Sequence, residues 1–331
     1  MRAGSALAAA LLLITSVLLA WPASAEPPQQ DAAATALEPA DAAAPSGYTE
    51  KGADTCLECH DDEADTLTFN TAGLFKTAHA HRTDERSPFG SGGLQCEACH
   101  GPGAQHSVNG KALDTINSLK PNSRLPVAQR NEPCLTCHQD QPRMAWHVGA
   151  HDRDQVACAD CHQSHVQDDP VLAKQTEADV CFRCHKEQRG QFQQASSHPV
   201  RFGRMTCSDC HNAHGSVSEV MLVKPTVNQT CYACHAEKRG PLLWEHAPVP
   251  EDCSLCHSSH GSAHTAMLNK SQPLLCQQCH SQAGHPSVAY TAAGLPGGGG
   301  GGSIFLVASS CANCHTQVHG SNHPAGAKLL R

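Results

Sequence analysis

The 331-residue sequence predicts short α-helices and irregular segments with very little β structure, arranged as an elongated array of two-motif repeats. Three observations lead to this fold class. The pattern Cys-X-X-Cys-His occurs ten times and uses all 20 cysteines. From the third motif to the ninth, successive first cysteines lie 22 to 26 residues apart. Aromatic residues make up only 4% of the chain and the mean hydropathy is -0.38, so the polypeptide alone offers little apolar surface for a core.

The repeated motif predicts the chemistry of the chain. Two cysteines three residues apart, followed at once by a histidine, are typical of covalent c-type haem attachment. The thiols form thioethers with the haem vinyl groups, and the histidine becomes an axial ligand of the iron. A disulfide scaffold would not require a histidine after every cysteine pair, and a zinc protein would pair Cys-X-X-Cys units without one. The sequence therefore predicts a multihaem cytochrome c with ten covalent haems.

Each motif contributes two thioether cysteines and one proximal iron ligand. The predicted thioether residues are Cys56, Cys59, Cys96, Cys99, Cys134, Cys137, Cys158, Cys161, Cys181, Cys184, Cys207, Cys210, Cys231, Cys234, Cys253, Cys256, Cys276, Cys279, Cys311 and Cys314. The predicted proximal ligands are His60, His100, His138, His162, His185, His211, His235, His257, His280 and His315. Because the haems supply the apolar interior, we expect the haem-free chain to be unfolded.

The other 14 of the 24 histidines supply candidates for the ten remaining iron positions. Even-numbered motifs have a trailing histidine shortly after them. Odd-numbered motifs are followed by an upstream histidine, which precedes the next motif. The predicted distal ligands are His79, His106, His151, His165, His198, His214, His246, His260, His285 and His319. The spacing alone leaves open His79 or His81, His147 or His151, and His319 or His323, and it leaves His264 as a surplus residue.

Two imidazoles on every iron would leave no position for a substrate. This ligation predicts an electron carrier with low-potential, bis-histidine haems and no catalytic residues. A catalytic haem would need a site without its second histidine, and the supply of histidines disfavours that. Methionine is the rival axial ligand, but packing is the expected role of the four methionines beyond the initiator. They are Met144, Met205, Met221 and Met267.

Three regions are expected along the chain. Residues 1–25 are typical of a secretory signal peptide, with Arg2, the apolar run Ala6–Ala20 and small residues before the cleavage point. Residues 26–47 are rich in Ala and Pro and are expected to be a disordered tether. Residues 48–331 form the decahaem domain, with regular two-haem repeats over about 134–275.

Local sequence gives weaker expectations for secondary structure. The decapeptide CFRCHKEQRG at Cys181 matches CYACHAEKRG at Cys231, which indicates repeats that stack on their neighbours. Short helical turns are expected to carry the motifs, and a longer helix is expected over Leu172–Cys184. The run Gly297–Gly302 is expected to be a flexible loop or a small insertion.

Charge is distributed unevenly around a net charge of -8, and no nucleic-acid partner is expected. Between Glu26 and Asp65 there are 11 acidic residues and a single base, whereas no acidic residue follows Asp252. Unlike charge at the two ends favours a different partner at each end. A solvated acidic leader without a partner is the alternative.

Three stretches carry a family resemblance. They are CEACHGPGAQH at Cys96, CYACHAEKRGPLLWEHAP at Cys231 and CHTQVHGSNHP at Cys314. With the ten motifs and the export signal, the chain resembles the DmsE/MtrA-type (MtrA/PioA/MtoA-like) family of decahaem c-type cytochromes over nearly the whole mature chain. The resemblance implies an elongated periplasmic wire inside an outer-membrane β-barrel porin. Such a wire serves extracellular electron transfer, in metal or iron reduction or in Fe(II) oxidation.

The resemblance also implies partners and leaves alternatives. The implied partners are the porin, a periplasmic or inner-membrane cytochrome, and a surface cytochrome or extracellular reductase. The implied location is the periplasm, in association with the outer membrane. A soluble periplasmic shuttle that feeds a reductase of the dimethyl sulfoxide or nitrite type is the first alternative. A multihaem reductase enzyme is the second.

Overall fold

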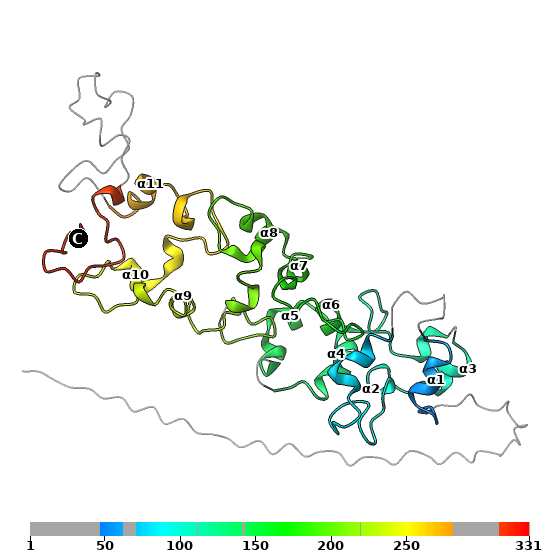
Figure 1. Cartoon of the computed structure of the whole chain (residues 1–331). Helices are drawn as coiled ribbons and strands as arrows, with labels where there is room; N and C mark the ends of the chain where they lie inside the picture. The colour runs from blue at the N-terminus through cyan, green and yellow to red at the C-terminus, as the bar shows by residue number, and fades with distance from the viewer. Residues whose placement is uncertain are drawn as a thin grey trace, which may run out of the picture. The chain divides into compact units, whose positions relative to one another are not determined.

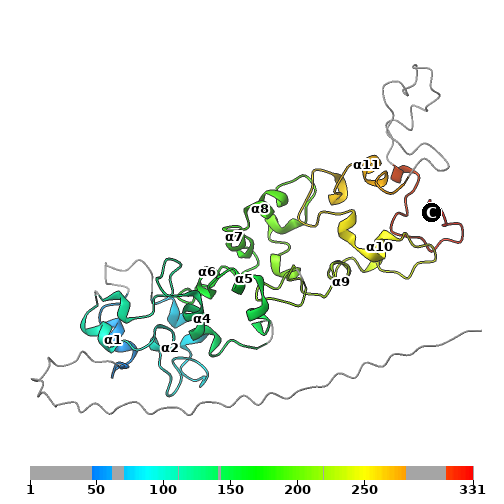
Figure 2. The ribbon, with the colours of Figure 1, turned by 180° about the vertical axis from the view of Figure 1, so that it is seen from behind.

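The computed structural model describes residues 47–61, 71–110, 112–140, 143–218, 220–280 and 311–330. Its α-helices are α1 (Ala53–Leu57), α2 (Glu97–His100), α3 (Ala104–Val108), α4 (Val127–Leu135), α5 (Ala150–Arg153), α6 (Cys158–Cys161), α7 (Glu177–Cys181), α8 (Lys186–Phe192), α9 (Val227–Tyr232), α10 (Pro248–Glu251) and α11 (Gln272–Cys276). Figure 1 shows these short helices joined by irregular chain, and Figure 2 shows the same helices from behind.

Short 3-10 helices make up much of the remaining regular structure. They are η1 (Leu74–Lys76), η2 (Ala78–Ala80), η3 (Leu113–Thr115), η5 (Trp146–Val148), η6 (Pro199–Phe202), η7 (Cys207–Asp209), η8 (Ala236–Lys238), η9 (Cys253–Leu255), η10 (Thr265–Met267) and η12 (Cys311–Asn313). Within the described ranges there is no strand, only four isolated antiparallel bridges. The predicted fold of short helices with very little β structure is therefore confirmed for this part of the chain. In the same part, no helix is long and apolar enough to span a membrane.

Several predictions concern residues outside the described ranges. They are the signal peptide 1–25, all but the last residue of the tether 26–47, the distal-ligand candidate His285 and the Gly297–Gly302 run.

The predicted long helix over Leu172–Cys184 is wrong. Only α7 is helical there, and the residues before it form turns. Asp169 begins these turns by accepting a hydrogen bond from the Val171 amide through Oδ1 at 3.3 Å. Leu172 is 75% exposed, so it provides no apolar anchor for an earlier helical turn. Short helices depend on tertiary packing, and in this segment buried residues begin only at Glu177, within α7.

Each motif forms the same tight turn. In all ten motifs the amide of the histidine donates to the carbonyl of the first cysteine, at 2.9 to 3.1 Å. Odd-numbered motifs place that cysteine in the last turn of a helix, as α4 and α9 do. Even-numbered motifs place it at the start of a short helix, as α6 and η9 do. The two-motif repeat is therefore also a repeat of backbone structure.

The loops after the sixth and eighth motifs are close copies of each other. His211 bridges to Leu222 and His257 bridges to Leu268, eleven residues downstream in both cases. The ring Nδ1 of His211 lies 3.0 Å from the Val220 carbonyl, and that of His257 lies 2.8 Å from the Ala266 carbonyl. This agreement supports the repeat that the sequence predicts between these segments.

The polypeptide core of the described residues is small. Phe182, Phe192 and Val200 form a buried cluster, with Ala178 and Met205 packed against it. Met205 thus has the packing role expected of it, whereas Met144 is 76% exposed and does not pack. So little buried side-chain area cannot offset the conformational entropy of a chain of this length.

We therefore expect a haem-free chain to unfold without cooperativity. The chain made without haem attachment should show circular dichroism typical of irregular structure and no thermal transition. The haem-loaded protein, as the control, should melt cooperatively. A cooperative transition in the haem-free chain would show that the polypeptide supplies its own core.

Candidate haem sites along the chain

The structure brings nine motif histidines together with nine histidines from outside the motifs. The pairs are His60–His106, His100–His165, His138–His79, His162–His214, His185–His151, His211–His260, His235–His198, His257–His319 and His280–His246, with ring centroids 6.0 to 6.3 Å apart. The tenth motif histidine is His315, and the candidate that remains for it, His285, lies outside the described residues.

The spacing of the pairs fits one iron between two imidazoles. A metal–imidazole bond is about 2 Å long, so two opposed ligands place their ring centroids roughly 6 Å apart. Aromatic rings also pack at centroid distances of this size. However, ordinary packing gives no reason for every pair to combine one motif histidine with one other histidine. The residues present therefore fit a haem iron.

The alternative histidines that the spacing left open lie in different surroundings. His79, His151 and His319 belong to pairs. The side chain of His147 is instead 74% exposed beside Asp152. The remaining two alternatives, His81 and His323, are exposed.

A lowered pKa favours the neutral ring at four trailing histidines, His165, His214, His260 and His319. Burial is the largest cause that lowers the pKa of His214 and His260, and the paired motif histidine lowers it further. Burial also lowers the pKa of His165 and His319. Metal binding requires the neutral imidazole, so these sites hold the ring in the form that can ligate.

Backbone carbonyls orient several motif histidines. The Nδ1 atoms of His100 and His315 each lie 2.8 Å from a carbonyl oxygen, of Asn117 and Lys328 respectively. A carbonyl can only accept, so Nδ1 must carry the proton. Nε2 is then left with the lone pair that a metal needs.

Upstream and trailing histidines are tied to each other by a repeated contact, which we call the histidine lock. Nδ1 of an upstream histidine donates to the carbonyl immediately before a trailing histidine. Within the part of the chain that the structure describes, the locks are His151 to Ala213, His198 to Ser259 and His246 to Val318, at 2.8, 2.7 and 2.8 Å. A glycine with positive φ follows each trailing histidine, namely Gly215, Gly261 and Gly320. Each lock joins the candidate ligands of two successive haems.

The cysteines place successive sites next to each other. The first cysteines of each odd-numbered motif and of the next even-numbered motif lie within electrostatic reach of each other. The pairs are Cys56 and Cys96, Cys134 and Cys158, Cys181 and Cys207, Cys231 and Cys253, and Cys276 and Cys311. The next motif is within electrostatic reach of Cys99, Cys161, Cys210 and Cys256. The ten sites therefore adjoin in chain order.

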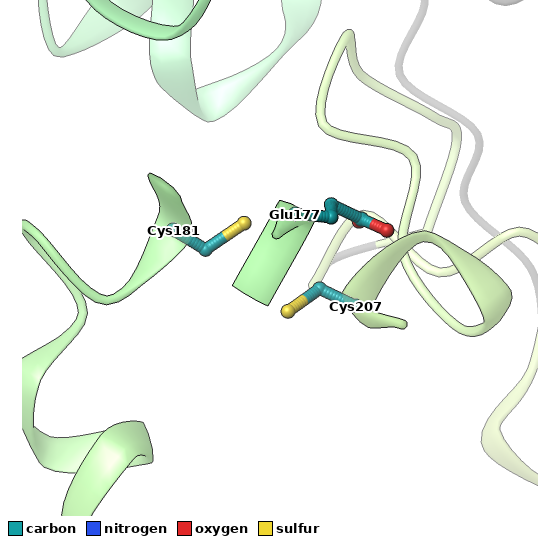
Figure 3. A group of neighbouring side chains, drawn as sticks. All are labelled: Glu177, Cys181 and Cys207. Atoms are coloured by element: carbon teal, nitrogen blue, oxygen red, sulfur yellow. The ribbon is translucent and has the colours of Figure 1, made fainter. Parts of the chain in front are cut away.

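One such junction also contains a buried carboxylate. The ligand atoms of Glu177, Cys181 and Cys207 lie within 4.8 Å of one another, and Figure 3 shows the two sulfur atoms turned toward each other. Both cysteines belong to motifs, so their sulfurs are used for thioethers and are not available to a separate metal ion. Glu177 accepts hydrogen bonds from the Ser208 amide at 2.9 Å and hydroxyl at 3.1 Å. It therefore fixes the start of the sixth motif.

Two asparagines do the same in other repeats. Oδ1 of Asn131 accepts from the amide of Cys158 at 2.8 Å, and Oδ1 of Asn228 accepts from the amide of Cys253 at 2.7 Å. Both asparagines lie three residues before an odd-numbered motif and are buried. The sequence analysis did not predict this role. An asparagine three residues before a motif, found in two repeats, could have indicated it.

Replacing Asn228 with alanine should destabilise the protein by about 1–3 kcal/mol, because buried polar groups would lose their partners. Besides the Cys253 amide, the carbonyls of Val249 and Pro250 accept from Asn228. Denaturant unfolding of the haem-loaded protein measures the effect. The exposed Asn109 gives the control Asn109→Ala, which should change stability by less than about 0.5 kcal/mol. Equal stabilities of the two variants would contradict the role assigned to Asn228.

Comparison with known proteins places these sites in a family. The model described as "Doubled CXXCH motif" matches residues 198–240 and 246–285, so each match begins at an upstream histidine. The model "Cytochrome c-type protein NrfB-like" matches residues 96–178. Multiheme cytochrome MtrA of Shewanella baltica is 46% identical over 288 residues, covering 87% of this chain and 84% of that protein. The chain belongs to the MtrA family of multihaem cytochromes.

Membership of the MtrA family confirms the resemblance seen in the sequence. The motifs of this MtrA-family chain are sites of c-type haem attachment, and its general function is multihaem electron transfer. Two more distant relatives share parts of the chain. Cytochrome c-type protein NrfB of Escherichia coli is 28% identical over 40% of this chain and 65% of its own length. The C-type polyheme cytochrome OmcB of Geobacter sulfurreducens is 29% identical over 52% of this chain and 16% of its own length.

Proposed function

We propose that the protein is a ten-haem electron wire in which two histidines ligate every iron. The observation that carries this proposal is the set of nine pairs, each with one motif histidine and one other at 6.0 to 6.3 Å. By the same rule, His315 takes His285 as its distal ligand.

Haem supplies reversible one-electron exchange at its iron when it is bound. One motif histidine and one other histidine would hold each iron, and this pair would leave no open position where a substrate could bind. The carbonyls that accept from Nδ1 keep several of these imidazoles in one orientation, as at His100 and His315. The adjoining cysteines of successive motifs support a series of sites that runs in chain order. The protein is on this account a carrier and not an enzyme.

We place the wire in the outer membrane, inside a β-barrel porin. The support is family membership together with a leader typical of export, which would bring residues 26–331 to the periplasm. The hydrocarbon core of a bilayer is about 30 Å thick, and a polar, haem-bearing chain would need a protein lining to cross it. The partners would be a periplasmic or inner-membrane cytochrome on one side. On the other side, a surface cytochrome or an extracellular reductase would exchange electrons with metal.

Reconstitution in sealed liposomes tests this placement. The protein should co-purify with a barrel protein from its own cells. Liposomes that hold both proteins should pass electrons from an external donor to a trapped acceptor dye, and liposomes with either protein alone should not. A protein that passes no electrons with the barrel present, and that never co-purifies with one, would contradict the placement.

A soluble periplasmic shuttle is the second candidate. The match of residues 96–178 to the NrfB-like model favours it, as does the partial identity to NrfB. A shuttle has the same haems and differs in its partner. In solution and without a barrel protein, the shuttle should pass electrons to a purified periplasmic reductase as fast as it receives them from its own donor.

A further inference from the structure

The fourth motif histidine has an unusual partner. Nδ1 of His162 lies 2.8 Å from a carboxylate oxygen of Asp169. Four other motif histidines use backbone carbonyls, as His100, His211, His257 and His315 do. The carboxylate of Glu237 lies farther from His235, at 3.7 Å, and both of those side chains are more than half exposed.

Asp169 is held in place for this contact. Its side chain is 13% exposed, and its second oxygen accepts from the amide of Val171 at 3.3 Å. The same segment contributes His165 to the pair with His100, the histidine of the second motif. The turn that starts at Asp169 therefore has two consequences. It replaces the first part of the predicted long helix, and it places a carboxylate against a candidate iron ligand.

A carboxylate partner changes the ligand that it contacts. It accepts the Nδ1 proton more strongly than a carbonyl does, and it raises the basicity of the imidazole. A more basic ligand and a nearby negative charge both stabilise ferric iron over ferrous iron. The reduction potential of the haem on that ligand is then lower, and partial burial strengthens the effect because water screens the charge less.

Nearby cations would raise the reduction potential of this haem, but they do not contact the ligand ring. Arg143 is within electrostatic reach of His214, which faces His162, but it pairs with Asp140 at 2.8 Å. Arg130 pairs with Asp160 at 3.7 Å. Both cations are partly balanced by acids of their own, whereas the Asp169 carboxylate contacts the ligand ring itself.

We propose that Asp169 is a positioning residue for His162 and that it lowers the reduction potential of the fourth haem below the value that a carbonyl partner would give. This inference rests on the proposed ligation of that haem by His162 and His214. The fourth site would then be a low-potential step near the middle of the series, and an electron would reside preferentially on its neighbours.

The test compares Asp169→Asn with Asp168→Asn. Asparagine keeps the shape and the accepting oxygen of Asp169 but removes its charge. Asp168 is adjacent and exposed, so Asp168→Asn removes the same charge where water screens it. A potentiometric titration followed by visible and magnetic spectra should show one haem with a higher midpoint potential in Asp169→Asn. The midpoints of Asp168→Asn should match the wild type.

Other results would overturn the inference. Unchanged midpoints in Asp169→Asn, with ten haems and a low-spin spectrum, would refute the role of Asp169 and leave the ligation intact. An equal shift in Asp168→Asn would show that general charge, and not the contact with His162, sets the potential. A wild-type protein with a high-spin or missing fourth haem would instead refute the proposed ligation. The alanine variant Asp169→Ala should in addition produce a high-spin fraction, because His162 loses its orienting partner.

Discussion

The double substitution of Cys181→Ala and Cys184→Ala should stop electrons from crossing the protein. Nine haems should remain attached, because the other nine motifs are intact. The fifth motif lies between the fourth and the sixth, since Cys181 contacts Cys207 on one side and interacts with Cys161 on the other. Removing its haem opens a gap in a series of sites, and electron tunnelling falls steeply with distance.

Mass spectrometry and the liposome assay together check this result. The mass should fall by one haem, and the rate of dye reduction should fall to that of liposomes without the protein. The matched control is the pair Cys56→Ala and Cys59→Ala in the first motif. This change shortens the series at one end and leaves the middle continuous, so passage should be slowed but not abolished. Unchanged passage in the fifth-motif variant would show that electrons follow a parallel route.

Gly215→Ala should cause a large loss of stability. Gly215 has φ +104, and a Cβ there would collide with the carbonyl oxygen of Ala145 and lie 3.1 Å from the Cα of Gly149. The positive φ alone should lower the free energy of unfolding by about 1–3 kcal/mol for a residue with a side chain. The collision of the new Cβ with the Ala145 carbonyl lowers it further. The change also disturbs the histidine lock between His151 and Ala213, and hence the candidate ligands of the fourth and fifth haems.

Gly190→Ala provides the control. Gly190 is exposed in α8, and a Cβ there meets no atom within 4 Å. Alanine should stabilise this helix by about 0.5–1 kcal/mol. Denaturant unfolding, followed by circular dichroism of the haem band, measures both variants. Equal midpoints for Gly215→Ala and the wild type would contradict the packing assigned to the lock.

Much of the fold follows from local sequence. The motif turn needs only two cysteines and a histidine at fixed spacing, and all ten form the same hydrogen bond. Few apolar side chains are buried among the described residues, so tertiary packing supports only short helices there. The helix expected over Leu172–Cys184 was wrong in its length. The turn at Asp169 and the exposure of Leu172 limit it to five residues.

The candidate sites could be predicted as a set but not as pairs. Nine of the predicted distal histidines face a motif histidine, but sequence position does not tell which one. His79 precedes the second motif and faces His138 of the third. His319 follows the tenth motif and faces His257 of the eighth. These pairings depend on how neighbouring repeats stack, which no local pattern encodes. The hydrogen-bond partners of several distal candidates, such as the Ala213 carbonyl beside His151, depend on the same tertiary contacts.

The central claim is that every haem iron has two histidine ligands. The most direct measurement is the electron paramagnetic resonance spectrum of the fully oxidised protein, integrated against the number of covalent haems found by mass spectrometry. The account predicts ten haems, all in low-spin signals typical of two imidazole ligands. Fewer than ten haems, or a high-spin signal from an iron with an open position, would contradict it.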